Sequence, residues 1–270
     1  MRPMTLDLLE VSTDQFVTTL RMNRPPVNAL VPELQEQLVE TLNRLKDSED
    51  TRVVILTSAI DRVFMAGADI KEMAAFDREN PSTLERVAQV SRRSQAAFTE
   101  IEHFAKPLIA AINGHALGGG CELALTCDYR FMVDDGRATI GQNETALGLI
   151  PGAGGTQRLP RLIGRGPASE LIYEGARLKA PRAAAVGLVN AALPADGFAE
   201  AVMERARRLA RMPPIALRLA KEAIIAGLER PPGKGYEVEA ENFGRAAMTE
   251  DAMMGIMSFI SKQEPEFKGK

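Results

Sequence analysis

The sequence predicts an α/β core over residues 1–195 and a helical C-terminal module over residues 196–270. In the first part, apolar runs typical of strands alternate with segments in which apolar residues recur at helical spacing. In the second part, helical spacing continues almost throughout. With 270 residues and 45% hydrophobic content, the chain can bury a full core, in one large domain or in a main domain plus a smaller one.

The N-terminal elements begin with two predicted antiparallel strands. Residues 5–11 and 16–22 alternate apolar and polar side chains, and residues 12–15 supply a short turn between them. A helix is predicted to start at Pro32 and to end near Asp47, because proline is favoured at the first helical position. Its apolar face consists of Leu34, Leu38, Leu42 and Leu45.

The central part of the chain continues the alternation of strands and helices. Residues 52–58 form a continuous apolar run, which is typical of a strand buried on both faces. We expect a long helix over residues 82–103, a strand over 108–112, and then a glycine-rich loop that opens another helix. Residues 138–166 are rich in glycine and proline, and we interpret them as an ordered functional loop system because helical segments flank them.

The C-terminal module is predicted as helices over residues 198–211 and 213–226, with a break at 230–235 before the last helices. The first helix carries a positive cluster whose helical spacing indicates a solvated face. The cluster consists of Arg205, Arg207, Arg208 and Arg211. With 33 basic and 36 acidic residues, the formal net charge is −3, which gives no electrostatic reason to expect binding to nucleic acid or anionic lipid.

The location of the protein is predicted from what the sequence lacks. No apolar run approaches the roughly 20 residues needed to span a bilayer, and the N-terminus has no apolar stretch typical of a signal peptide. We therefore expect a cytoplasmic protein that does not associate with membranes. Cys121 and Cys127 match neither a zinc site nor a redox CxxC motif, so we expect both to be packing residues.

Residues 111–128 place three consecutive glycines directly before Glu122. The first N–H groups of a helix have no intrahelical partner and favour negative charge, so this stretch predicts an anion or oxyanion site. A role limited to close helix–strand packing explains the glycines alone equally well. Neither GxGxxG nor GK[ST] is present, so the loop is not a dinucleotide or phosphate loop.

Residues 62–73 supply a second candidate donor. Asp69 and Glu72 resemble a capping box that starts a helix at Ile70, and the preceding Ala-Gly-Ala again exposes backbone N–H groups. Two such donors aimed at one carbonyl oxygen would form an oxyanion hole. For the carboxylates of Asp69 and Glu72, plain capping is the favoured interpretation over catalysis.

Two further acids are candidates for proton transfer. Glu122 lies in the first turn of its helix, where a capping role is the alternative, and Glu144 lies in a glycine-rich turn, where a solvated loop residue is the alternative. Sequence alone does not bring these residues together. The two histidines, His103 and His115, leave little material for a Ser-His-Asp or HExxH site, and we expect His115 to make only a local hydrogen bond.

Residues 64–73, 111–128, 140–164 and 185–194 together closely resemble the crotonase superfamily, and specifically the enoyl-CoA hydratases. The similarity covers essentially the whole chain. The resemblance implies an α/β crotonase-like spiral of ββα units with a helical C-terminal trimerisation module. It also implies assembly as a homotrimer or homohexamer and an acyl-CoA thioester as the ligand, with no metal and no cofactor apart from the coenzyme A of the substrate.

The resemblance assigns roles to the candidate residues. The thioester oxygen is held by the N–H groups of Ala68 and Gly119. Glu122 is the base that orients and activates water, and Glu144 is the acid that delivers a proton to the α-carbon. The implied reaction is syn addition of water across the 2,3 double bond of a 2-enoyl-CoA, which gives a 3-hydroxyacyl-CoA.

The resemblance also implies contacts to the rest of the ligand. The loop that meets adenine and pantetheine is matched by Ala66, Asp69, Ile70 and Lys71. Gly152 matches a backbone contact beside the catalytic water. Phe259 and Lys262 match an aromatic residue and a lysine that reach the nucleotide bound by a neighbouring subunit, with a core phenylalanine and a solvated lysine as the equal alternative.

One departure from the family pattern concerns the coenzyme A phosphates. Relatives carry a basic residue in the turn that corresponds to residues 23–30, whereas this turn is shorter and has Pro26 and Val27. The phosphate contact then falls to Lys71, Arg24 or Lys262.

Two other functions compete with hydration. A Δ3,Δ2-enoyl-CoA isomerase of the same superfamily moves a proton between carbons without adding water, and such enzymes commonly lack an acid at the position of Glu122. A non-catalytic RNA-binding member would need a basic surface and would tolerate the loss of either glutamate. The acidic balance of the chain and the presence of Glu122 and Glu144 favour hydration.

Overall fold

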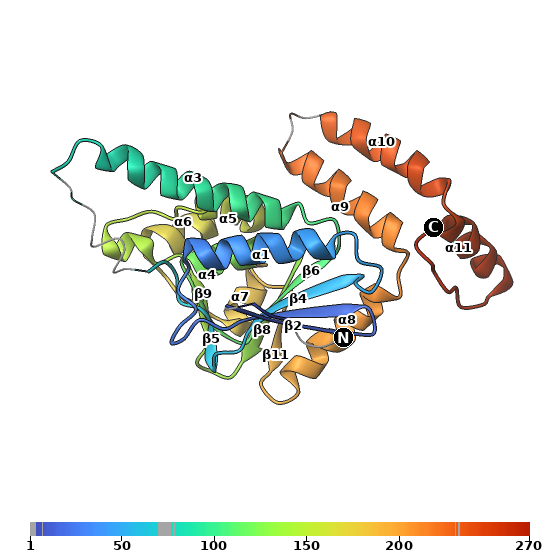
Figure 1. The fold of residues 1–270 in the computed structure, drawn as a ribbon, viewed down its shortest axis with the longest axis horizontal. Helices are drawn as coiled ribbons and strands as arrows, with labels where there is room; N and C mark the ends of the chain where they lie inside the picture. The colour runs from blue at the N-terminus through green and yellow to red at the C-terminus, as the bar shows by residue number, and fades with distance from the viewer. Residues whose placement is uncertain (1–3, 7, 70–76, 78, 230, 232) are drawn as a thin grey trace.

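The computed structural model describes residues 4–6, 8–69, 77, 79–229, 231 and 233–270. These residues form two sheets surrounded by helices, with the last three helices projecting to one side (Figure 1). The large sheet has the strand order β1-β2-β3-β4-β6-β8-β11, and the small sheet has the order β10-β9-β7-β5. In the part of the chain that is described, no helix is both long and apolar enough to cross a bilayer.

The strands fall into the two sheets as follows. The large sheet contains β1 (Met4–Leu6), β2 (Leu9–Asp14), β3 (Val17–Met22), β4 (Val53–Ser58), β6 (Leu108–Ile112), β8 (Tyr129–Asp134) and β11 (Ala191–Pro194). The small sheet contains β5 (Arg62–Met65), β7 (Gly114–Leu117), β9 (Thr139–Gly141) and β10 (Leu178–Lys179). From β3 to β11 the large sheet is parallel, and β4 is buried along almost its whole length, as its continuous apolar sequence predicts.

The N-terminal strands differ from the prediction in one respect. Residues 5–11 were expected to form one strand, but they belong to two antiparallel strands, β1 and β2, with Leu6 opposite Leu9. Strand β2 then continues through Asp14, so the hairpin turn to β3 is made by Gln15 and Phe16, both at positive φ. The alternation of apolar residues was detected correctly. The chain reversal within this stretch was not, because the sequence there has no glycine or proline to mark a turn.

The chain alternates between the two sheets in a repeating pattern. Strands β4, β6 and β8 are parallel neighbours in the large sheet, and each is followed by a strand of the small sheet, namely β5, β7 and β9. Strands β5, β7 and β9 are in turn parallel neighbours in the small sheet. This succession of strand pairs, with helix α4 (Gly119–Leu125) after β7, confirms the expected crotonase-like spiral of ββα units.

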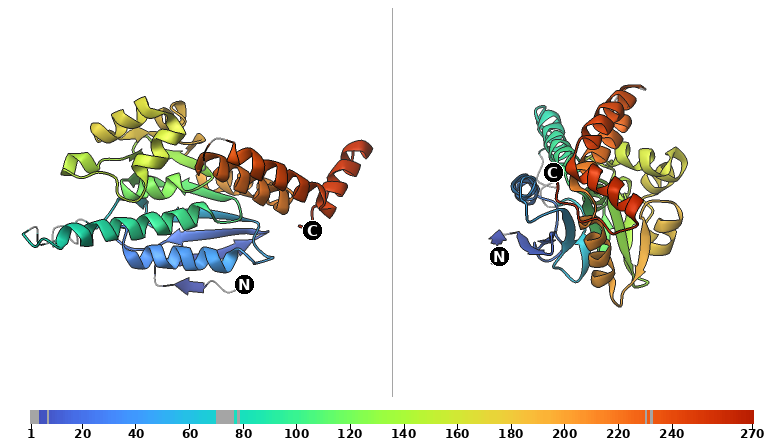
Figure 2. Two further views of the ribbon diagram at one scale, coloured as in Figure 1. Left: turned by 90° about the horizontal axis from the view of Figure 1, so that it is seen from above. Right: turned by 90° about the vertical axis from the view of Figure 1, so that its right-hand side faces the viewer.

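Helices cover the core on both sides. Helix α1 (Pro32–Leu45) runs beside α3 (Thr83–Glu102), and α1 buries Leu34, Leu38 and Leu42 as its spacing predicts (Figure 2). On the other side, α8 (Phe198–Ala210) packs on the strands of the large sheet and adds Phe198 and Val202 to the same core. The remaining helices of the core are α5 (Gly155–Ile163), α6 (Arg165–Tyr173) and α7 (Ala180–Ala185).

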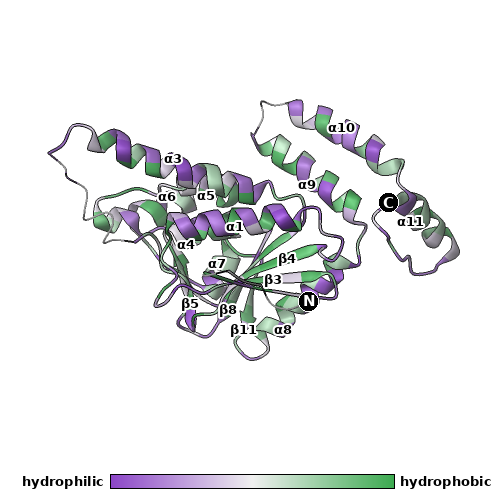
Figure 3. Cartoon of the chain, in the orientation of Figure 1, coloured by the Kyte–Doolittle hydropathy of each residue, from purple (hydrophilic) through white to green (hydrophobic). Residues whose placement is uncertain are grey.

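The C-terminal helices leave many apolar side chains exposed. Helices α9 (Pro214–Glu229), α10 (Lys234–Ala247) and α11 (Glu250–Ser261) extend away from the sheets, and apolar residues recur along them (Figures 1, 2 and 3). The exposed apolar residues there include Ile224, Leu228, Tyr236, Phe243, Met248, Met253, Ile256, Met257, Phe259 and Ile260. An apolar cavity of about 390 Å³ lies among these helices, lined in part by Phe243, Ala246 and Ile256.

Two other expectations concern the glycine-rich segments. The stretch before Glu122 was expected to be a loop, but Gly114–Leu117 forms β7, so the order is strand, strand and helix. Residues 138–166 are ordered, as expected, into β9, the short 3₁₀ helix η1 (Glu144–Leu147) and α5. Cys121 and Cys127 are buried free thiols whose pKa values are raised by burial, which fits a packing role.

Candidate active site

Three loops that follow neighbouring strands of the small sheet form the candidate site. Strands β5, β7 and β9 are parallel, so their carboxyl ends lie at the same edge of the sheet. Residues 66–69 follow β5, the glycines of residues 118–120 follow β7, and residues 142–144 follow β9. The amide N–H of Gly118 donates to the carbonyl oxygen of Gly141 at 2.9 Å, which keeps the last two loops side by side.

Glu122 lies in the first turn of α4 and is almost completely buried, with 3% of its surface exposed. Its Oε1 atom accepts hydrogen bonds from the backbone N–H groups of Ala153 at 2.7 Å and Gly155 at 2.8 Å. Burial raises the pKa of Glu122, while these two hydrogen bonds and the positive charge of Arg158 act in the opposite direction. The carboxylate is therefore desolvated but held by fixed donors.

Glu144 begins η1 and is half-buried. Burial raises the pKa of Glu144 to about 7, and the negative charge of Glu122 adds to this rise. A carboxyl group with this pKa exists in both protonation states near neutrality. The structure thus brings together the two acids that the sequence alone could not place.

Gln142 is a site residue that sequence reasoning missed. It is fully buried, and with its amide nitrogen turned toward Glu144 it donates to Oε1 at 3.1 Å and to Oε2 at 3.2 Å, the orientation that satisfies both groups. A Cβ atom at Gly155 would lie 2.6 Å from the same amide group. Gln142 therefore lies between the loop that binds Glu122 and the carboxyl of Glu144. The available signal was a polar side chain directly after an apolar strand.

The backbone amides of Ala68 and Gly119 lie close to each other. A Cβ atom built on Gly119 would lie 3.8 Å from the nitrogen of Ala68, and one built on Gly67 would lie 3.9 Å from the nitrogen of Gly119. Within the described ranges, neither N–H group donates to another backbone group. Two unpaired donors at one place form a possible oxyanion hole.

A hydrogen bond to the same peptide group fixes the direction of each donor. In a trans peptide the N–H and C=O groups point in opposite directions. The carbonyl oxygen of Gly67 accepts from the N–H of Leu30 at 2.8 Å, which orients the N–H of Ala68. The carbonyl oxygen of Gly118 accepts from the N–H of Glu122 at 2.9 Å, which orients the N–H of Gly119.

Gly118 connects the donors to the second acid. Its φ of +51° is a conformation that favours glycine, and a Cβ atom at this position would lie 2.8 Å from Oε1 of Glu144. The same Cβ atom would lie 3.7 Å from the Cα atom of Gly67. The carboxyl of Glu144 and both donor loops thus meet around this glycine.

The remaining predicted contact residues have different surroundings. The N–H of Ala66 donates to the carbonyl oxygen of Val27 at 3.1 Å, and Asp69 forms an ion pair with Arg24 at 3.3 Å. Arg24 therefore lies beside the loop of Ala68, and its contact with a phosphate stays a prediction. Ile70 and Lys71, together with the helix start predicted at Ile70, lie outside the described residues.

Gly152, Phe259 and Lys262 are placed in two separate regions. Gly152 directly precedes Ala153, whose N–H donates to Glu122, so Gly152 lies beside this acid. Phe259 lies on α11, and Lys262 directly follows that helix, far along the C-terminal extension from α4 (Figure 1). The structure does not bring them to the acids of their own chain, and contact with the ligand of a neighbouring subunit stays a prediction.

Other polar groups near the site have structural contacts. Nδ1 of His115 lies 2.9 Å from Oγ1 of Thr139. This histidine was expected in a loop with a local hydrogen bond, but it lies in β7, and its partner is in β9, 24 residues away. Among the described residues, no group of three or more His, Cys, Asp or Glu side chains is arranged to hold a metal ion.

The fold and the site together define a class: an α/β spiral that places two carboxyl groups beside two backbone N–H donors. A family model for enoyl-CoA hydratase/isomerase matches residues 12–270. The chain belongs to the enoyl-CoA hydratase/isomerase family, and hence to the crotonase superfamily.

Individual relatives match over nearly their whole lengths. The chain is 42% identical over 262 residues to human "enoyl-CoA hydratase domain-containing protein 2, mitochondrial". That alignment covers 95% of this chain and 87% of the relative. It is 39% identical over 263 residues to 2,3-dehydroadipyl-CoA hydratase of Escherichia coli, covering 97% and 99%. A crystal structure of an enoyl-CoA hydratase from Bacillus anthracis superposes with a TM-score of 0.89 at 40% identity, covering 98% of this chain and 100% of that chain.

Proposed function

We propose that this protein is an enoyl-CoA hydratase, which adds water syn across the 2,3 double bond of a 2-enoyl-CoA thioester and forms a 3-hydroxyacyl-CoA. The observation that carries the proposal is the presence of two acids with different surroundings beside one pair of backbone donors. An isomerase needs one group to move one proton, whereas hydration of a conjugated thioester uses two proton transfers.

In the proposed reaction, the N–H groups of Ala68 and Gly119 hold the thioester oxygen. Attack of water on the β-carbon moves an electron pair through the double bond onto this oxygen, and the two preoriented donors stabilise the resulting enolate-like charge. Removing one such donor typically costs about 2.7–4 kcal/mol of transition-state stabilisation.

The two acids divide the proton transfers. Glu122 accepts a proton from the attacking water, and its carboxylate is suited to this because two N–H groups and Arg158 favour its charged form. Glu144 donates a proton to the α-carbon, and its raised pKa of about 7 keeps a protonated fraction available at neutral pH. Proton exchange between the pair and solvent restores both groups before the next turnover.

The proposal extends to the ligand and to the assembly. Coenzyme A belongs to the substrate, and no redox cofactor is included because the addition of water is redox-neutral overall. No metal is included because the two backbone N–H donors supply the charge stabilisation at the thioester oxygen. Gly152, Ala66, Asp69, Ile70 and Lys71 would contact the ligand of their own chain, with Arg24 near the phosphates. We also propose that the exposed apolar helices α9, α10 and α11 assemble the protein as a homotrimer or a homohexamer of two trimers, so that Phe259 and Lys262 reach a neighbouring subunit's ligand.

Turnover of a panel of 2-enoyl-CoA and 3-enoyl-CoA thioesters tests the proposed function. The panel varies acyl length, branching and a terminal carboxylate, and the products are separated by mass and by retention. A hydratase yields a product heavier by one water from the 2-enoyl substrates. An isomerase would instead convert the 3-enoyl substrates to products of unchanged mass and would hydrate none of the 2-enoyl substrates.

A further inference from the structure

The loop that binds Glu122 is itself held by helix α3. The carbonyl oxygen of Gly152 accepts hydrogen bonds from Oγ of Ser91 at 2.6 Å and from Nε2 of Gln95 at 3.1 Å. This carbonyl belongs to the same peptide group as the N–H of Ala153, which donates to Glu122. Contacts on α3 therefore set the direction of a donor to the buried carboxylate.

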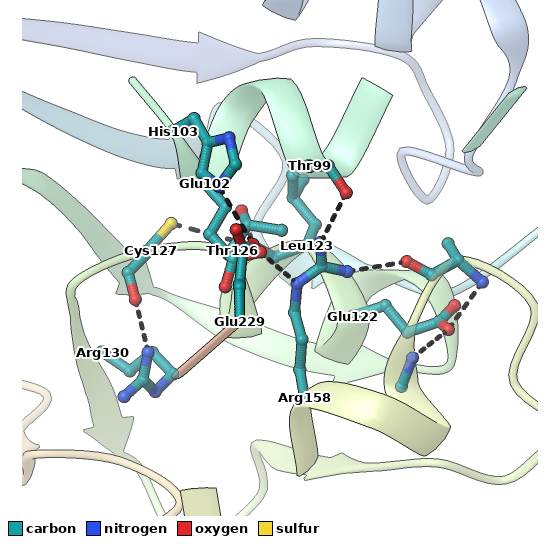
Figure 4. A network of polar contacts seen from close by, with 12 residues as sticks. Thr99, Glu102, His103, Glu122, Leu123, Thr126, Cys127, Arg130, Arg158 and Glu229 are labelled. Carbon is teal, nitrogen blue, oxygen red and sulfur yellow. Dashed lines mark hydrogen bonds and ion pairs between the residues drawn. The ribbon is translucent and has the colours of Figure 1, made fainter. Parts of the chain in front are cut away.

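Arg158 on α5 fixes the next peptide group of that loop. One terminal nitrogen of its guanidinium donates to the carbonyl oxygen of Ala153 at 3.0 Å, and Nε donates to Oε2 of Glu102 at 2.8 Å (Figure 4). The other terminal nitrogen donates to Oγ1 of Thr99 at 3.3 Å. The guanidinium thus joins the loop to two residues of α3.

The space around the loop is shaped for this side chain. The side chain of Arg158 is 12% exposed, so the cation is largely withdrawn from water. Gly154 has a φ of +111°, and a Cβ atom there would lie 2.1 Å from the guanidinium of Arg158. Since a planar guanidinium can serve three acceptors at once, lysine would not reproduce these contacts.

We propose that Arg158, anchored by Glu102, is a positioning residue for the water-activating carboxylate, because it fixes the 153–155 loop on Glu122 and supplies the positive charge that faces it. The inference rests on the proposed role of Glu122 as the base. Among the described residues, the charged groups that act electrostatically with Glu122 are Arg158 on α5 and Glu144 on η1. Glu102 and Thr99, on α3, act through Arg158.

Three variants separate charge, geometry and general stability. Arg158→Met removes both the charge and the N–H donors of the guanidinium, and Arg158→Lys keeps the charge but not the arrangement of the donors. Arg161→Met changes an exposed arginine of the same helix. We expect Arg158→Met to lower kcat by about 100-fold with little change in KM, since misplacing a catalytic group by about 1 Å can cost this much. We expect Arg158→Lys to lower kcat as well, and Arg161→Met to behave like the parent.

The pH profile distinguishes positioning from simple structural support. Loss of the cation favours the protonated form of Glu122, so the acidic limb of kcat/KM should move to higher pH in Arg158→Met and stay near the parental pH in Arg158→Lys. The proposal would be overturned if folded Arg158→Met kept both the parental kcat and the parental acidic limb of kcat/KM, as Arg161→Met is expected to do.

Two further measurements cover the cases of misfolding and of inactivity. If Arg158→Met leaves the half-buried Glu102 without a partner and does not fold, the double variant Arg158→Met/Glu102→Gln removes both charges and takes its place. Infrared difference spectra between acid and alkaline pH report the protonation of Glu122 without turnover, with its band assigned by its absence from Glu122→Gln. A parent without hydratase activity would contradict the proposed function alone, whereas a Glu122 band that titrates identically in all variants would contradict the positioning role.

Discussion

The N–H of Leu30 donates to the carbonyl oxygen of Gly67 at 2.8 Å, so a residue of the connection between β3 and α1 sets the direction of the N–H of Ala68. Leu30 also contacts the second donor, because a Cβ atom at Gly119 would lie 2.9 Å from its side chain. Asn28 supports this connection from within the core, donating to Ser58 at 2.7 Å and to the carbonyl oxygen of Phe64 at 3.0 Å. The possible oxyanion hole therefore depends on residues that are distant in sequence from both donors.

Replacing either acid by its amide should abolish most hydration. Positioned general acids and bases typically contribute about 100-fold or more to the rate, so we expect Glu122→Gln and Glu144→Gln each to lower kcat at least this much with little change in affinity for crotonyl-CoA. Stopped-assay product analysis and ligand titration measure the two quantities. Glu170→Gln, an exposed change on α6, is the control. Near-parental turnover in either active-site variant would contradict the mechanism with two carboxyl groups.

The rate should fall on the alkaline side because of Glu144. This group must be protonated to act as the proton donor, and its pKa is about 7, so kcat/KM should decrease as the pH rises through that value. Gln142 donates to the charged form of Glu144, and Gln142→Leu should therefore raise this pKa and move the alkaline limb to higher pH. A pH profile of both proteins measures the shift; a limb that moves to lower pH contradicts the assigned contact.

The same group should make folding stability depend on pH. The pKa of Glu144 is raised from 4.5 to about 7 in the folded protein, so the stability it contributes is fully present below 4.5 and is lost as the pH rises through 7. Glu144→Gln cannot ionise, so we expect it to melt at a higher temperature than the parent at pH 8 and at a similar temperature near pH 4.5. Thermal unfolding across this range measures the difference, and Glu170→Gln should show no such trend.

A single methyl group at residue 118 should disturb the site more than the fold. Gly118→Ala places a Cβ atom 2.8 Å from Glu144, whereas Gly136 also has a positive φ of +72° but has no atom within 4 Å of the added Cβ. Both changes put a side chain at a positive φ, which costs about 1–3 kcal/mol for residues held in sparsely populated backbone regions, and only Gly118→Ala should lower kcat. Thermal unfolding and kcat of the two variants are compared. Equal activity of both would show that Glu144 does not depend on the space at Gly118.

The proposed assembly should depend on the apolar C-terminal helices. Ile256 lies on α11, is 57% exposed and lines the apolar cavity, so Ile256→Glu would place a charge in the buried interface of an oligomer. We expect light scattering to show a trimer or hexamer for the parent and a smaller mass for the variant. Tyr173→Glu, on α6, is the matched control and should leave the mass unchanged. A parent that is monomeric at assay concentration contradicts the assembly.

Much of the fold was predictable because its signals are local. The leucines of α1 and the continuous apolar run of β4 define their elements without information from elsewhere in the chain. Strand β7 was missed because its sequence, Gly-His-Ala-Leu, has no strand pattern of its own, and its conformation depends on pairing with β5 and β9. The reversal between β1 and β2 was missed for a related reason, since neither glycine nor proline marks it.

The site was predictable only in its parts. Glu122, Glu144 and the two donor loops were identified from motifs and from the family resemblance, but their convergence follows from the register that pairs Leu117 with Gly141. Gln142 and Arg158 were not singled out. The position of Gln142 directly after a strand was its one signal, and neither an amide nor an arginine shows by its sequence context whether it makes a buried polar contact or a solvated one. Their roles emerge only from the hydrogen bonds of the folded chain.

Residue 122 uses its main chain and its side chain for different purposes. Its N–H donates to the peptide group that carries one of the two proposed oxyanion donors, and its carboxylate accepts hydrogen bonds from the loop that follows η1. Any amino acid other than proline can supply that N–H, so in the proposed mechanism the binding of the thioester oxygen does not depend on the side chain at this position. Under the proposed mechanism, such a scaffold can exchange its reactive side chains during evolution while the same backbone N–H groups continue to bind the substrate.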